Sequence, residues 1–111
     1  MFATAGPDGF EDVLPGVRRK TLCYGRETLI TEFRLAEGHE LLRHGHPHEQ
    51  TGYLVSGRLR FTIGEETREV GPGDSWCIPS GVTHGAVVLE DSVAVEVFSP
   101  VRVDFLPAGD G

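Results

Sequence analysis

Three of the five histidines lie in one short run, His44-Gly45-His46-Pro47-His48, and Gln50 follows two residues later. Imidazole nitrogens are among the commonest protein ligands for divalent first-row transition metals. Because side chains two residues apart on an extended strand point to the same side, His44 and His46 are expected to project in parallel. Pro47 interrupts that strand, so counting does not set the direction of His48 and Gln50. The run therefore offers half of a metal site.

The rest of such a site must come from elsewhere in the chain. His84 follows the turn Pro79-Ser80-Gly81, and only the fold can bring it to the other histidines. The same run of histidines is also compatible with an exposed loop that binds nothing. The spacing alone therefore leaves a metal site and a bland surface loop as alternatives.

Short alternating segments, separated by turn residues, must position these side chains. In the clearest segment, 58–63, Leu59, Phe61 and Ile63 face one way, and a turn at 64–66 leads to a returning segment at 67–70. Further strands are expected at 28–35, 53–55, 75–78, 84–89 and 92–98, with breaks at Ser56-Gly57 and Glu90-Asp91. Many short, regularly spaced strands favour a closed all-β barrel or sandwich, which hides its edges.

Composition limits what the chain can be. Its 111 residues make one domain, and a net charge of -7 argues against a nucleic-acid partner, which needs a basic surface. No apolar run approaches the length of a membrane span, and the polar N-terminus lacks a signal pattern, so a cytoplasmic protein is expected. Cys23 and Cys77 are then interpreted as buried thiols rather than as a disulfide.

A second group of candidate residues lies in the segment 92–100. By alternation, Glu96 shares one face with Ala94 and Phe98, while three valines share the other face. In an ordinary sheet the valines would point inward and Glu96 would point into solvent.

The spacing of these residues resembles the two motifs of the cupin family. The first motif is matched by Gly38, His44, His46, Gln50 and Gly57, although the family usually has glutamate at the position of Gln50. The second is matched by Gly73, Pro79, Gly81 and His84, although the family usually has asparagine where this chain has Val88. The resemblance implies a jelly-roll β-barrel over residues 17–106, between an N-terminal extension (1–16) and a C-terminal tail (107–111).

The resemblance also implies one metal ion, held by His44, His46, Gln50 and His84. Three neutral imidazoles and a neutral amide leave the charge of a divalent cation uncompensated, which favours an anionic substrate group. Such ligands accept Mn, Fe, Ni or Zn. His48 is an alternative ligand to Gln50, or a neighbour that orients the ligands.

Within the cupins, the chain resembles the pectin-degradation (KdgF-like) proteins at residues 46–53, 72–75, 96–102 and 104–106. That family opens and tautomerises unsaturated uronates into linear keto sugar acids. The resemblance implies a metal-dependent isomerase or lyase in which Glu96 transfers a proton and Arg102 binds a substrate carboxylate. The family usually has aspartate at the position of Glu96.

The remaining expectations concern the pocket, the partners and the competing functions. Phe98, Phe61 and Tyr53 are the candidate substrate-pocket aromatics, while Trp76 either lines the cavity or packs in the core. A small anionic substrate and a second copy of the chain are the expected partners, since small cupins commonly form homodimers. A metal-dependent oxygenase, with a dry cavity lacking an acid, and a non-catalytic binding or sensor domain, with a plugged pocket, are the alternatives.

Overall fold

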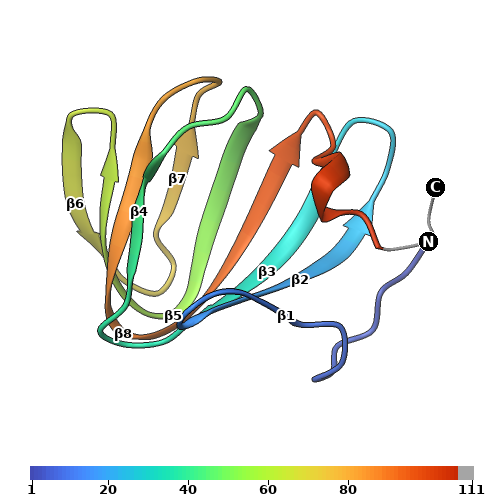
Figure 1. Cartoon of the computed structure of the whole chain (residues 1–111), viewed down its shortest axis with the longest axis horizontal. Helices are drawn as coiled ribbons and strands as arrows, with labels where there is room; N and C mark the ends of the chain where they lie inside the picture. Colours follow the sequence, from blue (N-terminus) through green and yellow to red (C-terminus); the bar gives the residue numbers. More distant parts are fainter. Residues whose placement is uncertain (108–111) are drawn as a thin grey trace.

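The fold is known from a computed structural model, which describes residues 1–107 (Figure 1). The strands are β1 (Glu11–Leu14), β2 (Val17–Tyr24), β3 (Leu29–Leu35), β4 (Glu40–His44), β5 (Glu49–Ile63), β6 (Glu66–Val70), β7 (Ser75–Ile78) and β8 (His84–Ser99). One 3₁₀ turn, η1 (Val103–Phe105), follows β8. Within residues 1–107 no helix has the length and apolar character needed to cross a membrane. The predicted all-β fold is confirmed.

Two long strands, β5 and β8, hold the sheet together. Every strand pairing is antiparallel, in the order β1-β2-β3-β8-β5-β6, with β4 added to β8 and β7 added to β5. Figure 1 shows β2 and β3 on one side of this central pair, and β4, β6 and β7 on the other. β4 pairs with the first half of β8 and β3 pairs with its second half. One strand therefore contributes residues to both parts of the sheet.

The breaks predicted at Ser56-Gly57 and Glu90-Asp91 do not end strands. β5 and β8 run through them, and their pairing register shifts around Gly57, whose φ is 94°. The Ser92 hydroxyl closes the bend, since it accepts from the Arg58 N–H at 3.1 Å and donates to the Glu90 carbonyl at 2.7 Å. These residues therefore bend two continuous strands, as a β-bulge does.

Apolar side chains fill the interior in two clusters. The larger contains Val17, Leu35, Leu54, Leu59, Phe61, Val70, Ile78, Ala86, Val88 and Ala94. The smaller contains Leu29, Phe98 and Phe105, the last of which is the buried residue of η1. Between them the interior is partly hollow, and this hollow is where the candidate residues gather.

The ends of the chain and the cysteines add detail to the sequence expectations. β1 lies within the stretch 1–16 and pairs with β2, while residues 108–111 of the predicted tail lie outside the described residues. Cys23 and Cys77 are both free cysteines, and Cys23 is half-buried rather than buried. The interpretation of Cys77 as a buried thiol is wrong, because this residue is exposed on the outward-facing side of β7.

Candidate functional site

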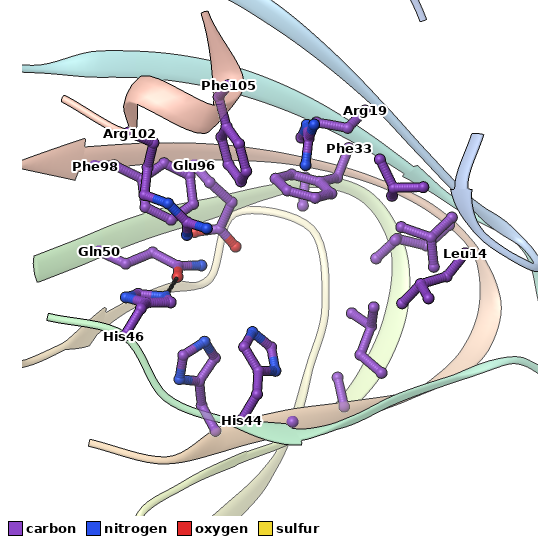
Figure 2. Close-up of a pocket in the computed structure, with 18 of the residues that line it drawn as sticks. Leu14, Arg19, Phe33, His44, His46, Gln50, Glu96, Phe98, Arg102 and Phe105 are labelled. Carbon is purple, nitrogen blue, oxygen red and sulfur yellow. Dashed lines mark hydrogen bonds between the residues drawn. The ribbon is translucent and has the colours of Figure 1, made fainter. Parts of the chain in front are cut away.

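Three histidines from separate segments meet at one end of the cavity (Figure 2). His44 ends β4 and pairs with His84 at the start of β8, and their ring centroids lie 4.4 Å apart. The ring of His46, from the loop after β4, lies 4.9 Å from that of His84. One donor nitrogen from each ring lies within 4.8 Å of the other two, so this cluster could hold a divalent metal.

A backbone carbonyl sets the orientation of each of these imidazoles. The Nδ1 atoms of His44, His46 and His84 lie 2.9, 3.0 and 3.0 Å from the carbonyl oxygens of Leu42, His48 and Val82, respectively. Because a carbonyl oxygen only accepts, each Nδ1 carries the ring proton and donates it. The neutral ring then presents the lone pair of Nε2, which is the tautomer that a metal ligand needs.

Gln50 on β5 extends this donor set. Its amide hydrogen-bonds to Glu96, and its Oε1 lies 3.0 Å from the Nε2 of His46, the contact drawn as a dashed line in Figure 2. With the ring proton of His46 on Nδ1, two lone pairs face each other across this contact. Adjacent ligands on one metal, each with a bond of about 2.1 Å, lie at about this separation. The donor set therefore fits a divalent metal.

Glu96 on β8 lies beside the donor set and is only 5% exposed. The indole N–H of Trp76 donates to both carboxyl oxygens, at 3.1 and 3.2 Å. Burial raises the pKa of Glu96 to about 7, and the hydrogen bonds from Gln50 and Trp76 only partly oppose that rise. A carboxyl group with this pKa can both accept and return a proton near neutral pH.

Arg102 also lines the cavity, together with two aromatic rings. The Arg102 guanidinium forms a two-pronged ion pair with Asp104, with contacts of 3.1 and 2.9 Å. This pairing lowers the pKa of Asp104. The same guanidinium lies 5.2 Å from the ring centre of Phe98 and 4.1 Å from that of Phe105. A charged, planar group therefore lines the same cavity as the histidines, and Phe98 lies between it and His46.

The cavity has a volume of about 280 Å³. Most of its wall is apolar and includes Val13, Leu14, Val17, Phe33, Leu35, Leu41, Leu59, Phe61, Ala86 and Ala94. An apolar wall with a few convergent polar groups is typical of a small-molecule site.

The cupin domain family matches residues 31–100 of the sequence. This chain is a cupin. It is 31% identical to the pectin degradation protein KdgF of Dickeya dadantii over 99 residues, which are 87% of this chain and 90% of that protein. Two solved structures are also similar. KdgF from Halomonas sp. has 33% identity and a TM-score of 0.90, over 96% of this chain and 98% of that one. An RmlC-like cupin from Shewanella frigidimarina has 31% identity and a TM-score of 0.84, over 87% of each chain.

Three side chains lie in other places than the sequence predicts. His46 does not share a strand with His44, because β4 ends at His44; the loop, not strand alternation, brings the rings together. Tyr53 does not line the cavity, because it points to the outer face of β5 and is 49% exposed. His48 lies outside the three-histidine cluster and contributes its backbone carbonyl to His46.

The two faces of β8 are also now assigned. Glu96 points inward together with Ala94 and Phe98, and all three are buried. The valines of the opposite face are only partly buried. The ordinary-sheet interpretation of this strand, with inward valines and a solvated Glu96, is therefore wrong in this cupin.

Sequence reasoning missed two parts of the site. Trp76 packs against the core, which is one of the two expected alternatives, and its indole N–H also donates to Glu96. The need of an indole N–H for an acceptor was the available signal for this second role. Arg19 on β2 lines the cavity as well. The sequence has arginine at both 18 and 19, and nothing in it indicates which of the two faces the interior.

Gly52 on β5 allows Trp76 and Glu96 to meet. It pairs with Trp76 on β7 and with Glu96 on β8, and a Cβ at this position would overlap both the Trp76 Nε1 and the Glu96 Oε2. The hydrogen bond between the two side chains therefore passes over a residue without a side chain.

Gly52→Ala is expected to destabilise the cupin by about 1–3 kcal/mol, because the added methyl group must displace the indole or the carboxyl group. Urea unfolding followed by fluorescence of the single tryptophan would measure this loss. Gly25→Ala is the matched control, since no atom of residues 1–107 lies within 4 Å of its added Cβ. Equal stability of the two variants would contradict the assignment.

Proposed function

We propose that this cupin is a metal-dependent isomerase or lyase that acts on a small anionic enol or unsaturated sugar acid by proton transfer. The observation that carries the proposal is Glu96, a buried carboxyl group with a pKa of about 7 in the same cavity as three convergent histidines. Similarity to two KdgF proteins, one described as a pectin degradation protein, supports the substrate class.

In this proposal His44, His46, His84 and Gln50 hold one divalent ion of Mn, Fe, Ni or Zn. When bound, the ion would supply a Lewis acid that stabilises negative charge on a substrate oxygen. Burial lowers the pKa of His84, which keeps this ring neutral and able to act as a ligand. The ligands themselves carry no charge, so the site favours an anionic substrate.

Glu96 is the proposed catalytic acid and base. In its ionised form it would accept a proton from one substrate atom, and in its protonated form it would return that proton to another, carbon to oxygen or the reverse. Gln50 and Trp76 both donate to this carboxyl group, so they hold it in place for the transfer. The side chain is one methylene longer than the aspartate usual in KdgF-like proteins. The hydrogen bonds from Gln50 and Trp76 fix the position of its carboxyl group.

Arg102 is the proposed carboxylate-binding residue, with Phe98 and Phe61 in the pocket wall. A guanidinium binds a carboxylate through two parallel hydrogen bonds, and Asp104 fixes the orientation of this one. A cavity of about 280 Å³ lies just below the usual range for drug-sized ligands, which suits a monosaccharide and not a polymer.

The same observations bear on the competing functions. A metal-dependent oxygenase was expected to have a dry apolar cavity without an acid, but Glu96 lies in this one. A non-catalytic binding domain was expected to have a plugged pocket, but this one is hollow. The presence of the acid and of Arg102 in one cavity therefore supports the isomerase or lyase.

Incubation of the metal-loaded protein with a panel of unsaturated uronates, released from pectin and from alginate, tests this proposal. We expect loss of the ultraviolet absorbance of the conjugated double bond, and a linear keto acid as product. Absence of turnover for every uronate with each of Mn, Fe, Ni and Zn would refute the proposed reaction.

We extend the proposal to a homodimer in the cytoplasm. On the outer face of the sheet, the partly buried Val95 pairs with the half-exposed Tyr53, and Val55 beside them is 48% exposed. An apolar face of this kind is stabilised when a second copy covers it. Light scattering should then give about twice the chain mass of 12.1 kDa; a monomer mass would contradict this part of the proposal.

A further inference from the structure

Arg19 faces the same cavity end as Arg102 but belongs to a different strand. Its side chain, on β2, is only 16% exposed, and its guanidinium carbon lies 3.7 Å from the ring centre of Phe105. Arg102 approaches the same ring to 4.1 Å, and Figure 2 shows the Phe105 ring between the two arginines. Two cations are therefore gathered at one end of the cavity of a chain whose net charge is -7.

The two arginines differ in how well they are neutralised. Arg102 occupies both oxygens of Asp104. Within residues 1–107, the one ion-pair partner of Arg19 is Glu11, which is 74% exposed and lies 3.7 Å away, beyond hydrogen-bond distance. A guanidinium carries five N–H donors. Desolvation lowers the pKa of Arg19, and the charges of Glu11 and Asp104 only partly oppose this, since neither acid hydrogen-bonds to the guanidinium within residues 1–107.

From this difference we infer that Arg19 is a second carboxylate-binding residue, and that the carboxylate of the substrate binds at the Arg19–Arg102 end of the cavity. The planar guanidinium matches the two oxygens of a carboxylate, and the Phe105 ring holds that plane in place. The remaining oxygens of a sugar acid then lie in the same cavity that Glu96 and the histidines line. The identity of the ligand as a sugar acid rests on the proposed function, but the contact between Arg19 and a carboxylate does not.

Isothermal titration calorimetry with D-galacturonate and D-galactose tests the inference, since galacturonate carries a carboxylate where galactose carries a neutral group. Neither sugar has the double bond that the proposed reaction needs, so binding is measured without turnover. Arg19→Gln is expected to weaken galacturonate binding about tenfold and to leave galactose binding unchanged. Arg19→Lys, which keeps the charge but loses the planar fork, is expected to weaken galacturonate binding less, and it replaces Arg19→Gln if that variant does not fold.

Arg18→Gln is the matched control. Arg18 is the preceding residue on β2, and it also lies over an aromatic ring, Phe10, and pairs with an acid, Asp12, but it faces away from the cavity. Galacturonate affinity should be unchanged in this variant. Wild-type galacturonate affinity in both Arg19 variants, or an equal loss of affinity for both sugars, would overturn the inference. So would a wild-type protein that does not prefer galacturonate to galactose.

The outcomes separate this inference from the proposed function. A protein that turns over no unsaturated uronate, but binds galacturonate through Arg19, would refute only the proposed reaction. A protein that turns over these sugars, but whose Arg19→Gln variant keeps its galacturonate affinity, would refute only the role of Arg19.

Discussion

Glu96→Gln is expected to reduce turnover of an unsaturated uronate by about three orders of magnitude while leaving the metal content unchanged. Glutamine retains the shape of the side chain and can still accept the indole N–H of Trp76, but it cannot take up or release a proton at neutral pH. The measurement is a steady-state assay of protein with matched metal content.

Glu90→Gln is the control for this variant, because it makes the same change on the same strand at an exposed position outside the cavity. Its turnover should equal that of the wild type. Unchanged turnover in Glu96→Gln would show that the proton is moved by another group, or by water.

The same substitution is expected to stabilise the metal-free protein at alkaline pH. The pKa of Glu96 is raised from its ordinary value of 4.5 to about 7, so the folded state holds this proton more tightly than the unfolded chain does. Stability from this group is complete below pH 4.5 and is lost as the pH rises to about 7. The difference corresponds to about 3 kcal/mol, which Glu96→Gln would not lose.

Urea unfolding of both proteins at pH 5 and at pH 8.5, after chelation of metal, would show the effect. Wild-type stability should fall between the two conditions relative to that of Glu96→Gln. Parallel pH dependence of the two proteins would mean that burial does not penalise the ionised carboxylate.

His46→Ala is expected to abolish metal binding, the second large effect. The wild-type protein should take up about one divalent ion per chain, whereas the variant loses one imidazole from the cluster and leaves the Oε1 of Gln50 without its neighbour. Elemental analysis after loading with manganese, nickel, zinc or iron measures the uptake. A thermal shift on addition of metal should occur in the wild type alone, because only a protein that binds the ion is stabilised by it.

His48→Ala is the matched control, since it removes an imidazole from the same run but leaves the backbone carbonyl that orients His46. Metal uptake should survive this change. Loss of metal in His48→Ala, but not in His46→Ala, would mean that His48 is the metal ligand in place of His46. A wild-type protein that takes up none of the four metals would refute the site altogether.

Alternation and turn residues correctly predicted an all-β chain, because both signals are local: side-chain direction repeats every two residues, and glycine and proline mark turns. The same local reasoning failed at Gly57 and at Glu90-Asp91. A bulge and a chain reversal have similar residue composition, and only the pairing partners of β5 and β8 distinguish a bend from an end.

The sequence by itself determined the class of fold, the family and the chemical types available to a site: imidazoles, an amide, a carboxyl group and an arginine. Only the tertiary structure decided which of them meet. It directed Glu96 inward and Tyr53 outward, placed His46 on a loop, and set Trp76 across Gly52 from Glu96. The physical reason is that burial and pairing between distant strands decide which side chains lose water and which donors they meet, and these depend on segments far apart in the chain.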